Sequence, residues 1–140
     1  MSKGPILYVD RSTITSDAVD ELRSRAAELV EFVKSREPRL LCYGFVIDAA
    51  AREMTVAAVH PDSASLELHL QLGGPRFAAI GRYITLRSIE VIGEPSPAAT
   101  EAIHAKARLL GNATVRIVPL EPGFARSLTA GNDAEPRSPI

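Results

Sequence analysis

The sequence contains no tryptophan, one cysteine and no long apolar run. Cys42 has no second cysteine with which to form a disulfide, and its apolar neighbours indicate a small hydrophobic side chain rather than a reactive thiol. No stretch approaches the ~20 apolar residues of a membrane span. Residues 1–5 are too short and polar for a signal peptide, so we expect a cytoplasmic protein.

The sequence also lacks an excess of charge of either sign. The formal net charge is −1 and no run of like charges occurs, so we expect neither nucleic acid nor a membrane as a partner. Of its 140 residues 46% are hydrophobic, which is enough to form the core of one domain. Residues 125–140 are small, polar or proline, which predicts a flexible tail after a single domain of residues 1–124.

Apolar periodicity predicts alternating strands and helices. The clearest helix ends before Pro38, because its apolar residues recur at spacings of three and four. These residues are Val19, Leu22, Ala26, Leu29 and Val33. Residues 12–17 precede this helix and are interpreted as capping residues. The predicted strands are residues 6–9, 40–47, 54–59, 84–92 and 113–120, and further helices are predicted at residues 62–72, 75–83 and 98–110.

Residues 62–72 allow two interpretations. Leucines at positions 66, 68, 70 and 72 alternate with polar residues, and this period of two favours a strand. However, Pro61, Asp62 and Ser63 are typical of a helix start, and the run lacks the β-branched residues that strands prefer. We therefore predict a helix that is apolar on two sides and lies buried beside a cavity.

The order of these elements is β-α-β-β-α-β followed by a further α-β. This order predicts an α+β fold with a ferredoxin-like, split-βαβ sheet and a C-terminal α-β extension. The helices would cover one face of the sheet. Because the first three strands are apolar on both sides, we expect a second copy of the chain to cover the other face, giving a homodimer.

Residues 59–70, Val-His-Pro-Asp-Ser-Ala-Ser-Leu-Glu-Leu-His-Leu, resemble the strand-to-helix junction of the antibiotic biosynthesis monooxygenase-like family. A serine and, a few residues on, a histidine recur at this junction in that family, and the resemblance extends over about residues 6–93. It implies a dimeric α/β barrel with a cavity in each subunit between sheet and helices. The superfamily contains cofactor-free monooxygenases, haem-degrading enzymes and isomerases, so the resemblance implies no single activity.

The sequence departs from this family in its aromatic and amide residues. The cofactor-free monooxygenases tend to use a tryptophan and an asparagine, whereas this chain has no tryptophan and only Asn112 and Asn132. The sequence context of the haem-degrading branch is also missing. His60, His69 and Cys42 have no metal-ligand spacing, and the glycines form no nucleotide-binding pattern. We therefore expect no metal, haem or other cofactor.

His69 is the candidate catalytic residue. Imidazole gains and loses a proton near neutral pH, and an apolar wall favours its neutral, proton-accepting form, which suits a general acid or base. The alternative is a structural histidine that lines the pocket with one hydrogen bond. The remaining predicted pocket residues are apolar or aromatic: Tyr8, Tyr43, Phe45, Leu66, Phe77 and Tyr83.

Two functional hypotheses follow. The first is a small-molecule enzyme of the monooxygenase-like or isomerase kind, independent of cofactors, that acts on a largely apolar substrate. The second is a non-catalytic dimeric module that binds a hydrophobic ligand or serves as an assembly unit. They differ in whether more than one polar group converges on the pocket.

Overall fold

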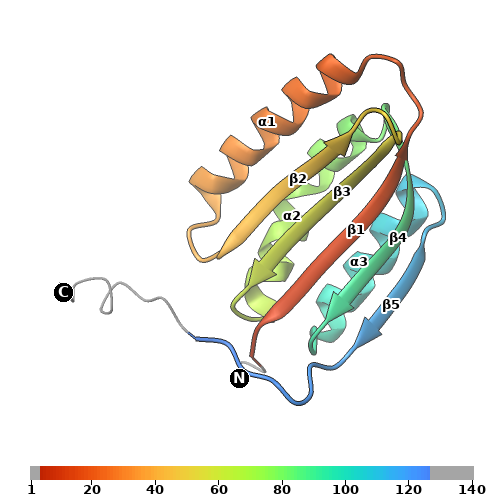
Figure 1. Cartoon of the computed structure of the whole chain (residues 1–140). Coiled ribbons are helices and arrows are strands. Elements are labelled where there is room, and N and C mark those ends of the chain that lie inside the picture. The colour runs from red at the N-terminus through yellow and green to blue at the C-terminus, as the bar shows by residue number, and fades with distance from the viewer. Residues whose placement is uncertain (1–3, 127–140) are drawn as a thin grey trace, which may run out of the picture.

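The computed structural model describes residues 4–126, in which five strands form one sheet and three helices lie against one face of it (Figure 1). The elements are β1 (Ile6–Ile14), α1 (Val19–Arg36), β2 (Cys42–Asp48), β3 (Glu53–His60), α2 (Ser63–Ile80), β4 (Ile84–Ile92), α3 (Pro97–Leu110) and β5 (Thr114–Val118). The strand order is β2-β3-β1-β4-β5, with β4 and β5 parallel and all other neighbours antiparallel. The predicted ferredoxin-like fold with its α3–β5 extension is confirmed. Residues 127–140 of the predicted tail lie outside the described residues.

None of the described helices is long and apolar enough to cross a membrane. The helix predicted before Pro38 is α1, whose apolar stripe is buried as expected. Helix α3 begins within one residue of the predicted start at residue 98, and the Ser96 side chain caps it by accepting a hydrogen bond from the Ala99 N–H at 3.1 Å.

Strand β1 is longer than predicted. Its alternation of buried and more exposed residues does not end at residue 9 but continues to Ile14. The interpretation of residues 12–17 as helix caps is therefore wrong for residues 12–14, which belong to the strand. The physical reason is that β1 pairs with β3 on one side and β4 on the other along its whole length. This pairing places two polar side chains, Asp10 and Ser12, on the buried face.

Helix α2 settles the ambiguity at residues 62–72. The helical prediction is confirmed, and Asp62 caps the helix by accepting a hydrogen bond from the Ser65 N–H at 3.0 Å. The predicted break before residue 75 is wrong, because the helix continues through Pro75 to Ile80. Burial of Phe77 and Ile80 in the core overrides the weak helix propensity of Gly73-Gly74-Pro75.

Strand β4 has the predicted bounds but a different facing. In its pairing with β1, Arg11 lies opposite Ser88 and the next residue, Ser12, lies opposite Leu86. Arg87 of β4 therefore has no partner in β1 and forms a β-bulge. Before the bulge the even-numbered positions 84 and 86 are buried, so strict alternation predicts that positions 88 and 90 are buried as well. After the bulge the odd-numbered Ile89 is buried instead.

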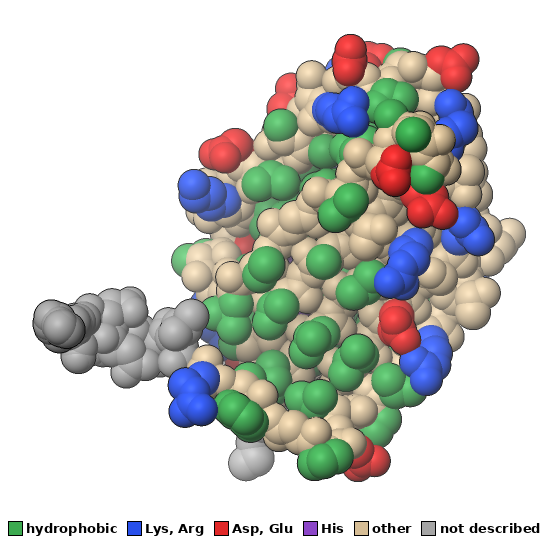
Figure 2. Space-filling view, in the orientation of Figure 1, with side chains coloured by type: hydrophobic (Ala, Val, Ile, Leu, Met, Phe, Trp, Pro, Cys, Tyr) green, Lys and Arg blue, Asp and Glu red, His purple; other side chains and the backbone are tan. Residues whose placement is uncertain are grey.

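The face of the sheet turned away from the helices is rich in apolar side chains (Figure 2). They come from strands across the sheet, and Val46 in β2 is 62% exposed. Leu7, Val9, Val59 and Ile92 alternate with buried neighbours and are only partly covered. As predicted, the helices cover only one of the two faces.

Candidate active site

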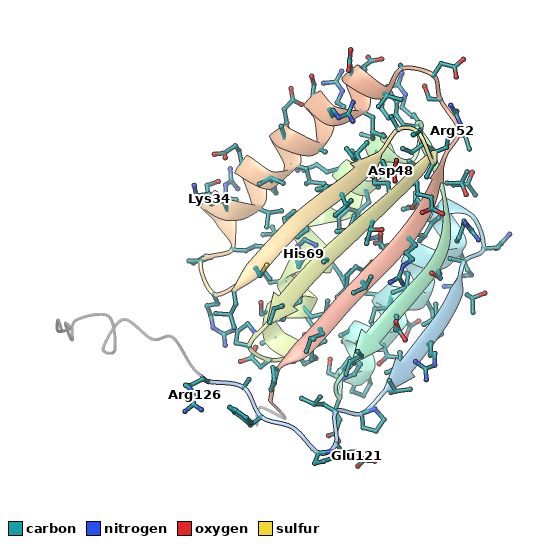
Figure 3. The ribbon with its side chains drawn as sticks, viewed as in Figure 1. Lys34, Asp48, Arg52, His69, Glu121 and Arg126 are labelled. Atoms are coloured by element: carbon teal, nitrogen blue, oxygen red, sulfur yellow. The ribbon has the colours of Figure 1, made fainter. Side chains whose placement is uncertain are left out.

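His69 and Glu37 form a buried pair between α2 and the end of α1. The Nδ1 atom of His69 lies 3.0 Å from each carboxylate oxygen of Glu37, and both side chains are almost completely buried. Figure 3 shows His69 behind the sheet, on the side of α2. Because a carboxylate only accepts, Nδ1 carries the proton and donates it. In neutral imidazole the other nitrogen, Nε2, is then an acceptor.

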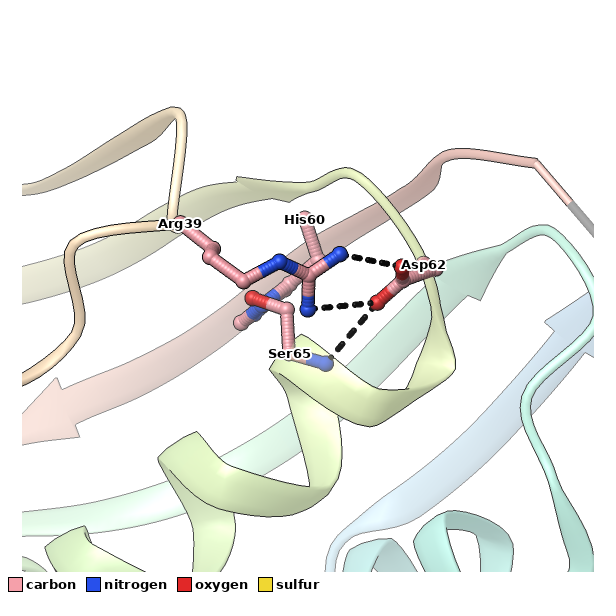
Figure 4. Close-up of polar contacts among 4 residues, drawn as sticks. All are labelled: Arg39, His60, Asp62 and Ser65. Atoms are coloured by element: carbon pink, nitrogen blue, oxygen red, sulfur yellow. Dashed lines mark hydrogen bonds and ion pairs between the residues drawn. The ribbon is translucent and has the colours of Figure 1, made fainter. Parts of the chain in front are cut away.

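A second contact fixes the position of this pair. Glu37 ends α1, where its N–H donates to the Val33 carbonyl at 2.8 Å. Two residues later Arg39 forms a bidentate ion pair with Asp62, the cap of α2 (Figure 4). Hydrogen bonding to Arg39 lowers the pKa of the Asp62 carboxyl, which keeps it charged. The loop that carries Glu37 is thereby tied to the helix that carries His69.

His60 lies beside His69 but has a different environment. It is fully buried at the end of β3, with Nδ1 2.8 Å from the Ser65 hydroxyl and its ring centre 5.6 Å from that of His69. Burial, together with the neighbouring His69, lowers the pKa of His60 to about 3. His60 is therefore neutral and structural, and it does not line the cavity described below.

A second buried charged pair joins β1 to α3. The Tyr8 hydroxyl donates to Asp10 Oδ2 at 2.6 Å, and the Lys106 ammonium lies 2.8 Å from the Tyr8 hydroxyl and 3.1 Å from Asp10 Oδ2. Burial raises the pKa of Tyr8 well above its ordinary value, so its hydroxyl keeps its proton. The ammonium also lies 4.0 Å from the centre of the Phe77 ring.

His69 and the Asp10–Lys106 pair line one cavity between the helices and the sheet, whereas Glu37 is not among its lining residues. The void, including its open mouth, measures about 380 Å³, of which about 30 Å³ admits the centre of a water molecule. Its polar lining residues are Asp10, Ser12, His69 and Lys106, and the remaining lining residues are apolar or aromatic. The Phe77 ring lies close to both groups, since its centre is 5.6 Å from the His69 ring centre and 4.0 Å from the Lys106 ammonium. An imidazole and an ammonium group therefore share one aromatic neighbour.

The structure brings together some of the residues that the sequence predicted for the pocket. Tyr43, Phe45 and Phe77 line the cavity together with His69, whereas Tyr8, Leu66 and Tyr83 do not. Tyr8 lies behind Asp10 and orients it, and Leu66 is completely buried in the core. Tyr83 is the last residue of the turn before β4, where its carbonyl accepts the N–H groups of residues 15 and 16.

Sequence reasoning missed Asp10, Ser12, Glu37 and Lys106. Each has a signal in the pattern, because each is a polar residue at a position where the apolar period continues. Asp10 and Ser12 extend the alternation of β1, and Glu37 follows Val33 by four residues on the stripe of α1. Lys106 follows Ile103 by three residues on α3. A charged residue on a buried face was the signal that could have located the site.

No family model matches the chain, and no curated protein matches it. Solved structures do. MupZ from Pseudomonas fluorescens has 17% identity and a TM-score of 0.67, covering 90% of this chain and 91% of MupZ. SnoaB from Streptomyces nogalater, described as a cofactor-independent oxygenase, has 18% identity and a TM-score of 0.55, covering 66% of this chain and 95% of SnoaB. A protein described as an antibiotic biosynthesis monooxygenase has 21% identity and a TM-score of 0.52, covering 66% and 99%.

At these identities the likeness is one of fold. The fold is that of the monooxygenase-like structures, as the junction at residues 59–70 suggested. The 66% covered by SnoaB is about the share of this chain that runs from β1 to β4. The match to MupZ covers a larger share of this chain, 90%.

Proposed function

We propose that the protein is a cofactor-independent enzyme of the monooxygenase-like or isomerase kind, in which His69 transfers a proton to or from a small, largely apolar substrate. The observation that carries this proposal is that His69, hydrogen-bonded to the buried Glu37, and the Asp10–Lys106 ion pair line the same largely apolar cavity. A simple hydrophobic binding module needs no such groups, and burying them is costly. The non-catalytic alternative is therefore disfavoured.

The chemistry follows from the tautomer of His69. With Nδ1–H donated to Glu37, the Nε2 lone pair accepts a proton from a substrate in the cavity, and the imidazolium that forms is stabilised by the carboxylate. The electron pair of the broken bond stays on the substrate. In an isomerase the proton returns at another atom of the substrate. In a monooxygenase molecular oxygen adds to the electron-rich substrate, the resulting peroxide takes the proton back from His69, and the O–O bond breaks with loss of water to leave one oxygen atom in the product.

Substrate binding requires the cavity to widen, since the space of about 30 Å³ for water centres is smaller than an organic substrate needs. Phe77 lies on α2 close to both His69 and Lys106, and it follows Gly73-Gly74-Pro75. Pro75 has no N–H to donate to the preceding turn, and glycines weaken a helix. We propose that the second half of α2 moves to admit the substrate.

The test compares His69→Gln with the wild-type protein. Candidate substrates are small aromatic and alicyclic compounds, screened in air and without oxygen, because only an oxygenase needs oxygen. We expect His69→Gln to lower turnover by about 10²–10⁴-fold, the usual contribution of a general acid or base. His104→Gln, on the exposed side of α3, is the control and should retain full activity. Full activity in His69→Gln would refute the catalytic role.

We also propose that the chain forms a homodimer through the open face of the sheet. Its support is the apolar surface around Leu7, Val9 and Val46, which no helix covers. Light scattering should give twice the mass of the 15.0 kDa chain at micromolar concentration, and Val46→Lys should yield monomers. A single-chain mass for the wild-type protein would contradict this arrangement.

A further inference from the structure

We infer that Asp10, Ser12 and Lys106 form a binding subsite for a hydroxyl group, so that the substrate is an apolar molecule that carries a hydroxyl. This inference rests on the proposed function, because it places the substrate in the cavity that His69 lines. It assigns to the α3–β5 extension a role in recognition, through Lys106.

Ser12 supplies the first observation. Its side chain is 1% exposed and lines the cavity, and its Oγ has no hydrogen-bond partner within the described part of the chain. A buried hydroxyl without a partner is unfavourable, and such groups in folded proteins call for an explanation. Valine or alanine would fill this strand position without that cost. A polar group of a ligand in the cavity gives Ser12 its missing partner.

The Asp10–Lys106 pair supplies the second observation. Both hydrogen bonds accepted by the Asp10 side chain go to Oδ2, so Oδ1 makes none among the described residues. The Lys106 ammonium has three N–H groups and uses two of them, on Tyr8 and Asp10. The pair thus offers one acceptor and one donor and is neutral overall. A hydroxyl, which both donates and accepts, matches this set better than a carboxylate or an ammonium group does.

The geometry places this subsite within reach of His69. Ser12 lies two residues after Asp10 on the same face of β1, a separation of about 7 Å along the strand. Lys106 and His69 both lie near the Phe77 ring and are less than about 10 Å apart, from the two distances to the ring centre. A molecule the size of one or two rings, held by its hydroxyl at the subsite, therefore reaches His69.

Phenol and toluene are the probes that test the subsite, because they have nearly the same shape and differ in the hydroxyl. An apolar cavity without polar partners prefers toluene, since phenol must give up its hydrogen bonds to water. We expect the wild-type protein to bind phenol at least as tightly as toluene, measured by chemical-shift titration of the protein. Ser12→Ala should weaken phenol binding by about 5–10-fold and leave toluene binding within about twofold.

Lys106→Met should weaken phenol binding by about 10-fold or more, because the lost hydrogen bond is to a charged group. If Lys106→Met does not fold, the double variant Asp10→Asn/Lys106→Met, which lacks both charges, is used in the same titration. Met54→Leu changes an apolar wall of the same cavity and should affect both probes equally. A wild-type preference for toluene, phenol binding too weak to detect up to its solubility, or an unchanged preference in Ser12→Ala and the Lys106 variant would each overturn the inference.

His69→Gln separates this inference from the proposed function. It should lose turnover but keep the preference for phenol. If phenol is preferred but turnover does not depend on His69, the subsite stands and the catalytic proposal fails. If turnover depends on His69 but toluene is preferred, the catalytic proposal stands and the hydroxyl subsite fails.

Discussion

The two buried pairs differ in the group that faces the carboxylate, which is an imidazole in one and an ammonium in the other. In His69–Glu37 the imidazole donates from Nδ1 to the carboxylate and keeps a second nitrogen, Nε2, that can accept a proton. In Asp10–Lys106 the carboxylate accepts from the ammonium, and the Tyr8 hydroxyl donates a further hydrogen bond to Asp10. The first pair is suited to exchanging a proton and the second to binding with fixed polarity. This difference can be tested through stability as well as activity.

Removing one charged partner should lower the free energy of unfolding far more in Asp10–Lys106 than in His69–Glu37. Lys106→Met leaves the Asp10 carboxylate buried without its cation, so we expect the free energy of unfolding to fall by about 3–5 kcal/mol. The matched change Glu37→Gln leaves a neutral hydrogen-bonding side chain beside His69, and its expected cost is about 1 kcal/mol. Urea denaturation of both variants measures the difference.

Equal losses in the two variants would contradict this comparison. The double variant Asp10→Asn/Lys106→Met is a further check, because it removes both charges. It should recover most of the stability that Lys106→Met loses.

The position of the Phe77 ring, which lies near both His69 and Lys106, depends on Gly73. A Cβ atom at position 73 would lie 2.3 Å from the Phe77 Cζ atom, so Gly73→Ala must displace the ring. We expect a loss of about 1–3 kcal/mol in unfolding free energy, typical of overpacking. Tyr43 and His69 resonances should shift as well, since both rings neighbour this region. Unchanged His69 resonances would show that the ring does not control the site.

The effect of His60 on stability can be measured as a function of pH. Its folded-state pKa of about 3 lies below the ordinary value of 6.5, so the unfolded chain binds the additional proton as the pH falls. The free energy of unfolding should therefore decrease from about pH 6.5 downward, by up to about 1.4 kcal/mol per pH unit. Urea midpoints of His60→Gln should show a flatter dependence between about pH 4 and 6.5. The same slope in both proteins would assign the effect to other groups.

Gly74 is the matched position for Gly73 and should give the smallest effect. A Cβ atom there meets nothing within 4 Å. Gly74→Ala should raise the free energy of unfolding by about 0.5–1 kcal/mol, because alanine is the better helix former. It should also slow ligand association if the second half of α2 opens the cavity. Faster association, measured by stopped-flow mixing, would count against that motion.

Much of the architecture was predictable from local pattern. The stripe of α1, the caps Asp62 and Ser96, and the bounds of β4 follow from period and capping chemistry, which depend on neighbouring residues alone. The helix at residues 62–72 also followed from its start signals, against the alternation of its leucines. His69 was found in the same way, as a polar side chain on an apolar helix face.

The tertiary structure decided the rest. The end of β1 depends on strands that pair with it from distant parts of the chain, and without that pairing Ser12 was assigned to a helix cap. The partners of His69 and Lys106 are 32 and 96 residues away in sequence. Sequence alone therefore determined the order and type of the elements and proposed one candidate residue, because these depend on local periodicity. Only the folded structure decided which charges meet in one cavity, because that depends on contacts between distant segments.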